Sequence, residues 1–304
     1  MPHPERAGLL FVLAGFCTLS IGDALVKSMP GMWPATAIAA LRYLVGTVFL
    51  GLLLARSEGV RALALPRSGV QWVRGIAISC SALGMFFAVW IMPLAEATTI
   101  AFTQPMITAI LAIVVLREPS RPATWISTLI AFVGVLIVLR PNFAVIGWGV
   151  LFPLLGATGM AVTIIANRAS RSHASVLALQ YYMSVTALIV LCGATVVGHL
   201  SGIEQFVVHW PHWSVILRCV IMGFSATLAQ YLIFMGTMKA GPGTVAPMTY
   251  GQLLAAVSLG WIFFGEVPDA ISMLGAAVIV GAGLYLWYAS RERKTGDVFP
   301  TAAD

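Results

Sequence analysis

Three charged residues, Asp23, Arg42 and Glu96, lie within long apolar stretches of the sequence or at the start of one. A charge in the hydrocarbon of a membrane is costly unless it is paired or hydrated, and such residues usually mark a functional site. Arg42 lies about nine residues into its stretch, roughly 13 Å along a helix and near the middle of a bilayer. The sequence therefore predicts that Arg42 either binds a ligand carboxylate or forms a structural pair with Asp23 or Glu96.

Asp23 and Glu96 are the carboxylates that we expect to carry protons if transport is coupled to a proton gradient. Asp23 shares a helical face with Lys27, four residues later. We expect the Lys27 amine to extend toward the membrane surface, whereas Asp23 lies deeper. The alternative is equally open: both acids are fixed counterions of Lys27 and Arg42, and neither of them titrates.

Uncharged side chains could complete a binding site. Thr99 and Thr103 follow Glu96 on one helical face, and they either line a ligand path or make ordinary hydrogen bonds between helices. Amide and phenol groups suit a polar ligand, whereas aromatic rings form an apolar wall or simply pack. The candidates of these two kinds are Gln104, Tyr250 and Gln252, and Phe86, Trp90 and Tyr231. Glu118 and Glu266 are expected to be structural, with each carboxylate hydrogen-bonded to the start of a neighbouring helix.

These residues must be positioned by membrane helices, because 60% of the 304 residues are hydrophobic and only 9% are charged. Between the charged residues lie eight stretches of at least 18 residues, each long enough to cross a bilayer as a helix. They are residues 75–95, 97–116, 122–139, 141–167, 172–203, 219–238, 240–265 and 270–290. Residues 7–28 and 33–54 are as long, although each contains charges. The sequence predicts an all-α integral membrane protein with ten spans.

The net charge of +6 follows from where the basic residues fall. With the N-terminus inside, most of the 17 basic residues lie at cytoplasmic ends or loops, as the positive-inside rule requires. This pattern encodes orientation and does not indicate nucleic acid. We expect a multi-pass protein of the inner membrane with both termini in the cytoplasm, residues 57–68 cytoplasmic and residues 200–209 external. Arg218, inside a span, is expected to reach outward.

The chain also repeats itself. A shift of 141 residues lays GLLFVLAG (8–15) on GVLFPLLG (149–156) and Lys27 on Arg168, and a shift of 148 pairs Gln104 with Gln252. The matches predict two five-helix repeats, residues 1–144 and 145–290, followed by a cytoplasmic tail, residues 291–304. Because five is odd, the second repeat must enter the membrane from the opposite face. Inverted repeats of this kind are typical of carriers that work by alternating access.

Several motifs resemble a known family. PLAEATTIAFTQP (93–105), LRE (116–118), FGE (264–266), DALVK (23–27) and LRY (41–43) look like the EamA branch of the drug/metabolite transporter superfamily. The resemblance covers about residues 7–290. It implies a secondary carrier of small metabolites, often an exporter of amino acids or related compounds, with a cavity between the halves. The first half departs from the pattern, because LRE lacks the glycine that often precedes the glutamate.

Other functions were weighed against transport. The chain has no GxSxG, HExxH or P-loop motif, so we predict neither an enzyme nor an ATP-driven pump. HWPHW (209–213) could hold a metal, but tryptophans at a membrane interface explain it as well, and no metal or cofactor is predicted. The partners expected are a small-molecule substrate and lipid, with a monomer or homodimer. The alternatives are an importer of a nucleoside-like metabolite such as S-adenosylmethionine, or an uncoupled facilitator or channel.

Overall fold

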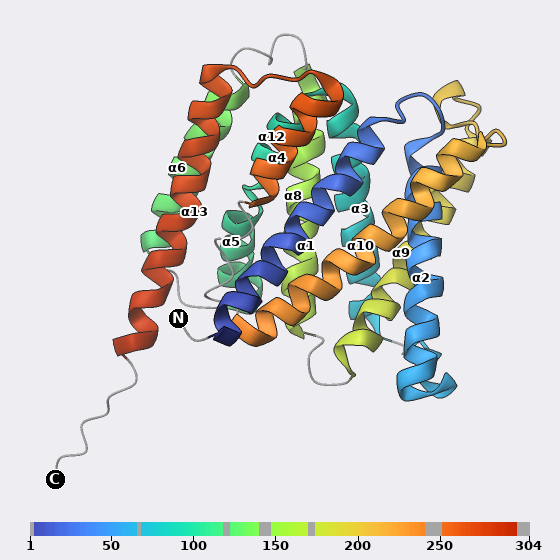
Figure 1. Cartoon of the computed structure of the whole chain (residues 1–304), viewed down its shortest axis with the longest axis horizontal. Coiled ribbons are helices and arrows are strands. Elements are labelled where there is room, and N and C mark those ends of the chain that lie inside the picture. Colours follow the sequence, from blue (N-terminus) through green and yellow to red (C-terminus); the bar gives the residue numbers. More distant parts are fainter. Residues whose placement is uncertain are drawn as a thin grey trace.

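The computed structural model describes residues 3–65, 68–117, 122–139, 147–169, 174–240 and 251–296, and in these ranges the chain is helical with no strand (Figure 1). The α-helices are α1 (His3–Lys27), α2 (Ala35–Glu58), α3 (Gly69–Ile91), α4 (Leu94–Ala101), α5 (Gln104–Leu116), α6 (Pro122–Leu139), α8 (Leu151–Ala169), α9 (Val176–Leu200), α10 (Trp213–Ala240), α12 (Gly251–Phe264) and α13 (Ala270–Gly296). Short 3-10 helices η1 (Val60–Leu63), η2 (Gly147–Val150) and η3 (Glu204–Phe206) lie in the connections.

Within the described ranges, 7 helical segments are long and apolar enough to cross a membrane. One of them, Leu94–Val115, combines α4 and α5, because the helix predicted over residues 97–116 is interrupted after Ala101. The interruption has a local cause: Pro105 in the first turn of α5 has no N–H to continue the helical ladder. α12 and the Ala270–Tyr285 part of α13 are apolar but shorter.

Large apolar side chains cover the outside of the bundle, whereas small residues fill much of its inside. Leu129, Phe132 and Val197 are each more than half exposed, while Ala97, Ala161 and Ala187 are fully buried. Exposed tryptophans gather near helix ends: Trp148, Trp210 and Trp213 precede or begin α8 and α10, and Trp72 and Trp125 lie at the starts of α3 and α6. An apolar outer surface bounded by tryptophans is typical of a protein surrounded by lipid.

Four pairs of helices pack along one another, and each pair joins a helix before residue 140 to a helix after residue 147. The pairs are α1 with α10, α3 with α8, α2 with α9, and α6 with α13 (Figure 1). Glycines allow close approach: a Cβ at Gly84 of α3 would lie 2.6 Å from the Phe152 carbonyl oxygen of α8. The two parts of the chain are therefore interleaved over a shared interface.

Two features end helices near one end of the bundle, the upper end in Figure 1, where α1 finishes and α2 begins. Pro93 follows the end of α3 and precedes the first residue of α4. Gly265 ends α12 with φ +66°, a left-handed conformation that glycine adopts without strain. This end, where α1, α3 and α12 finish and α4 and α13 begin, is called the Lys27 end below. Pro242 and Pro247 lie outside the described residues.

Candidate functional site

Arg42 lies in the second turn of α2 and turns its side chain toward aromatic rings inside the bundle. Its guanidinium carbon is 5.4 Å from the centre of the Tyr43 ring and 5.7 Å from the centre of the Phe86 ring. Phe86 itself is only 1% exposed, so this cation-π contact is inside the protein. The structure thus brings Phe86, which we predicted as part of an apolar wall, beside the predicted binding residue Arg42.

Asp23 of α1 is the acidic residue whose charge acts on Arg42, although no ion pair within 4.0 Å joins the two in the described structure. The Asp23 carboxylate accepts a hydrogen bond of 3.5 Å from the Gln252 amide nitrogen at the start of α12. The backbone of Gln252 is fixed in turn, because its carbonyl accepts a hydrogen bond of 3.0 Å from the Ser20 hydroxyl. Arg42, Asp23 and Gln252 therefore form one polar group from three helices.

Trp90 and Tyr231, the other two predicted wall residues, have different positions. The Trp90 indole donates a hydrogen bond of 2.8 Å to the Val26 carbonyl, so it fixes α3 against α1. Tyr231 is 58% exposed on α10, on the same stripe as Phe224 and Leu228. Its spacing from these neighbours places it on one exposed side of the helix, and a place for Tyr231 in an inner wall stays a prediction.

The threonine stripe after Glu96 is buried, but its hydroxyls bond to their own helix. Thr99 donates to the Ala95 carbonyl at 2.7 Å, and Thr103 donates to the Ile100 carbonyl at 2.8 Å. Gln104 likewise donates to Thr108, one turn along α5. These bonds satisfy each hydroxyl hydrogen locally and involve no neighbouring helix. That the stripe lines a ligand path stays a prediction. Tyr250, the remaining candidate, lies outside the described residues.

Glu96 is 9% exposed and accepts a hydrogen bond of 3.4 Å from the Ser272 hydroxyl of α13. It lines a cavity of about 110 Å³ together with Glu266 and the backbone around Pro93 and Pro268. Glu96 therefore lies at the contact of α4 with α13.

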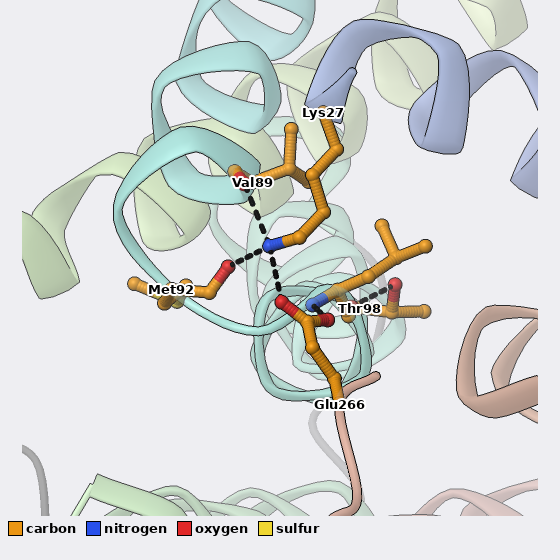
Figure 2. A network of polar contacts seen from close by, with 6 residues as sticks. Lys27, Val89, Met92, Thr98 and Glu266 are labelled. Carbon is orange, nitrogen blue, oxygen red and sulfur yellow. Dashed lines mark hydrogen bonds and ion pairs between the residues drawn. The ribbon is translucent and has the colours of Figure 1, made fainter. Parts of the chain in front are cut away.

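Lys27 makes the contact that differs most from its sequence prediction. Its amine does not extend to the membrane surface but lies 2.7 Å from a Glu266 carboxylate oxygen, in a pair with side chains only 11% and 22% exposed. The amine also donates to the Val89 and Met92 carbonyls, at 3.0 and 2.8 Å (Figure 2). The second oxygen of Glu266 accepts a 2.9 Å hydrogen bond from the Leu94 N–H at the start of α4. This last bond is the one that we predicted for Glu266.

Two further arginines tie helix ends together, and the sequence analysis missed the role of the first. Arg74 of α3 is 2% exposed and donates to the Asn167 and Gln71 side chains at 2.6 Å each, and to the Leu179 carbonyl at 3.0 Å. Arg218 of α10 donates to the carbonyl of Ser28, next to the end of α1, at 2.8 Å. Its predicted outward reach is therefore replaced by a bond to another helix. The position of Arg74 near a loop in the sequence gave no sign of its burial.

Two histidines make hydrogen bonds at the two ends of the connection between α9 and α10. His199 accepts a hydrogen bond from the Val208 N–H, and His212 contacts Ser214. The described part of the chain holds no group of three His, Cys, Asp or Glu side chains that could bind a metal ion.

Comparisons with known proteins match both the first and the second part of the chain. The model of the EamA-like transporter family matches residues 6–140 and again residues 147–288. The S-adenosylmethionine uptake transporter of Rickettsia prowazekii (strain Madrid E) is 24% identical over 94% of each chain. The pseudopaline exporter CntI of Pseudomonas aeruginosa (strain UCBPP-PA14) is 30% identical over 94% of this chain and 96% of its own. A solved crystal structure that is 21% identical superposes with a TM-score of 0.61 and covers 93% of this chain and 98% of its own, which supports the fold alone.

Proposed function

Because the chain belongs to the EamA-like transporter family, we propose that it carries a small metabolite with a carboxylate across the inner membrane by alternating access. Family and relatives are small-molecule transporters and not enzymes. The single observation that carries the proposal is Arg42: a cation inside the bundle, flanked by two rings and free of an ion pair within the described structure. Its planar fork of N–H donors can bind a carboxylate with two parallel bonds.

Asp23 is the residue that we propose for proton coupling. When Asp23 is ionised, its charge attracts Arg42 and repels a ligand carboxylate at the same site. Protonation of Asp23 removes both effects, so binding of a proton favours binding of the ligand. Glu96, held by Ser272 at the contact of α4 with α13, is the second candidate proton carrier.

Ten spans in two inverted repeats are part of the proposal, and the helix contacts support it. If the first five spans are exchanged with the last five, α1 becomes α8, α3 becomes α10, and α5 becomes α12. The contact of α1 with α10 then becomes that of α8 with α3, and the contact of α1 with α12 becomes that of α8 with α5. The pairs α2 with α9 and α6 with α13 map onto themselves. A pseudo-two-fold axis in the membrane plane produces this pattern.

Individual residues follow the same exchange. Gly15 of α1 and Gly156 of α8 correspond in the repeat, and each packs against the third span of the other half. A Cβ at Gly15 would lie 2.9 Å from the Ala229 carbonyl oxygen, and one at Gly156 would lie 3.4 Å from the Met85 nitrogen. Arg74 and Arg218 correspond likewise, since each begins a third span and bonds near the end of the other half's first helix.

We propose that the Lys27 end faces the outside and that both termini lie in the cytoplasm. Supporting this orientation, Arg56, Arg61 and Arg117 lie near the opposite end, after α2 or α5 or at their last turns. We propose export of an amino acid or related compound as the main activity, in keeping with the relative named as an exporter. Uptake of a compound such as S-adenosylmethionine is the second candidate, favoured by the relative of that name. The linkage at Asp23 separates the two candidates, because it moves proton and ligand in the same direction and so drives uptake, whereas export draws on the gradient of the substrate or of an exchanged compound.

The proposal is tested by a thermal-shift screen of the purified protein against carboxylate-bearing metabolites. A ligand at 100 times its Kd should add about 2.7 kcal/mol of stability. We expect at least one compound to stabilise the wild type and to leave Arg42→Ala unchanged, while it still stabilises Arg218→Ala, which removes a cation away from the site. A ligand that stabilises Arg42→Ala as strongly as the wild type would exclude Arg42 from the site.

A further inference from the structure

We propose that Lys27 and Glu266 form a gate that closes the Lys27 end of the bundle by capping the two helix ends on either side of Pro93. The gate contact joins α1 to the turn between α12 and α13, and thus residues from opposite halves of the chain. The inference rests on the proposed transport cycle. Its test measures water access and not transport, so that either one can fail alone.

The gate lies at the turn between α3 and α4, where one helix ends and the next begins. The last carbonyls of a helix and its first N–H groups have no partner within the helix. At Pro93 both kinds meet, because α3 ends at Ile91 and α4 begins at Leu94. Lys27 bonds the Val89 and Met92 carbonyls, and Glu266 bonds the Leu94 N–H. The cation thus lies at the negative end of α3 and the carboxylate at the positive end of α4.

The end of α12 and the turn after it close over the pair. The Phe264 ring lies 5.6 Å from the Lys27 amine, and α12 ends directly after it. The Glu266 N–H then bonds back to the Gly260 carbonyl at 3.0 Å, which turns Glu266 toward α4. A Cβ at Gly260 would lie 3.2 Å from the Glu266 carboxylate, so glycine leaves room for it. The chain around Glu266 is therefore arranged to hold the carboxylate in this position.

The contact can open because its partners belong to separate segments. Nearly all the polar groups joined here come from different segments: α1, the α3–α4 break and the α12–α13 turn. If the turn moves away from α1 and α4, the Lys27 amine loses the Glu266 carboxylate, the Leu94 N–H loses its acceptor, and the carboxylate loses both partners at once, so that only water can replace them. The closed state is consequently dry and the open state wet. Glu266 also lines the cavity that contains Glu96.

The gate and the candidate site are joined by α1, which carries both Asp23 and Lys27. Lys27 lies four residues after Asp23, so the two share one face of α1 and are one turn apart. Opening at Lys27 would admit water from that end toward Asp23 and Arg42. We therefore assign Lys27 and Glu266 a conformational role and not a role in binding substrate.

The test uses a reporter cysteine introduced as Ser20→Cys in the full chain, with Cys17, Cys80, Cys192 and Cys219 changed to alanine. Ser20 is fully buried in α1, two turns before Lys27. A membrane-impermeant maleimide is applied to intact cells and to inside-out vesicles. We expect Lys27→Met and Glu266→Gln each to raise the labelling rate at least tenfold, from one face only. Unchanged labelling in both variants overturns the gate.

The matched control is Arg218→Gln, which removes another cation bonded beside the end of α1. We expect it to leave the labelling rate within about twofold of the wild type, a change of about 0.4 kcal/mol. A rise equal to that of Lys27→Met would show general loosening of the helix end and would overturn the assignment to Lys27 and Glu266.

A charge swap separates capping from simple attraction. In Lys27→Glu combined with Glu266→Lys, a carboxylate would face the Val89 and Met92 carbonyls, and an ammonium would face the Leu94 N–H. We expect labelling to remain raised, although the two charges still attract each other. Recovery of slow labelling would show that attraction between the two charges is sufficient, and it would overturn the role of capping the helix ends.

Variants that fail to fold are replaced by a tethered protein. Lys27→Cys and Glu266→Cys are combined in the background without other cysteines and joined by a short bifunctional methanethiosulfonate. We expect amide hydrogen exchange over residues 94–101 to be at least tenfold slower in the tethered protein than after reduction. Equal exchange in the two forms, or failure of the two cysteines to be joined, overturns the proposal.

Discussion

Asp23 and Lys27 lie one turn apart on the same face of α1, yet they contact different parts of α12. Asp23 meets the Gln252 amide at the start of that helix, whereas Lys27 meets the Glu266 carboxylate just after its end. The two contacts are possible together because α1 packs along α12. A shift between these helices would therefore change the surroundings of the candidate site and of the proposed gate in the same movement.

The first prediction concerns Asp23. Asp23→Asn keeps the size of the side chain and its ability to accept from Gln252, but it removes the charge. If Asp23 is the coupling residue, accumulation driven by an imposed proton gradient is lost in proteoliposomes, while exchange between equal substrate pools continues, because Arg42 still binds the ligand. Should the wild type itself ignore an imposed pH gradient, the protein is a facilitator or exchanger, and Asp23 is only a counterion.

Arg74 gives a prediction about stability. Arg74→Met removes a buried guanidinium and leaves the Asn167 and Gln71 amide oxygens and the Leu179 carbonyl without this donor. We expect a loss of about 3 kcal/mol in the free energy of unfolding, measured by denaturant titration in detergent. The Arg218 guanidinium is only partly buried, so Arg218→Met should lower the free energy of unfolding by about 1 kcal/mol. Equal losses would contradict the difference in burial.

Helix packing is tested at Gly84. A Cβ there would lie 2.6 Å from the Phe152 carbonyl oxygen and 2.7 Å from the Gly156 nitrogen, and neither backbone atom can move without moving α8. Gly84→Val should therefore separate α3 from α8 and lower the unfolding free energy by at least about 2 kcal/mol. Gly193→Ala is the control, since a Cβ at Gly193 meets nothing within 4 Å. A stable Gly84→Val protein would show that α3 and α8 do not pack as described.

The inverted repeat predicts which loops share a side of the membrane. Ser57, in the last turn of α2, and Ser201, directly after α9, are both exposed, and the two helices correspond in the proposed repeat. Single cysteines introduced at these two positions in the cysteine-free background should be labelled from opposite faces, that of Ser57 from the cytoplasm. Labelling of both from one face would rule out the inverted repeat.

The sequence predicted the helical membrane class and the family, because apolar length and motif order carry that information. It also predicted that the Glu266 carboxylate meets a helix start. It did not predict the partner of Lys27. Spacing along α1 shows which residues share a face. The two carbonyls that Lys27 bonds lie at the end of α3, next to Pro93, and only the folded chain brings them to Lys27.

Tyr231 and Arg74 show the same limit in two other ways. In a membrane helix both the inner and the outer face are apolar, so an aromatic residue such as Tyr231 has no sequence signal for its direction. Arg74 resembled a loop cation because charged residues near span ends usually reach water. Its burial depends on Asn167 and Leu179, which are distant in the sequence.

Counterflow in proteoliposomes tests the central claim most directly. Vesicles holding the purified protein and a saturating amount of the ligand found by thermal shift are diluted into a trace of the same ligand carrying a radioactive label. An alternating-access carrier with Arg42 at its site should accumulate the label transiently above equilibrium, and Arg42→Lys should reduce the initial rate at least tenfold, because the ammonium lacks the planar fork. Flux without accumulation or saturation would indicate a channel, and an unchanged rate in Arg42→Lys would contradict the site.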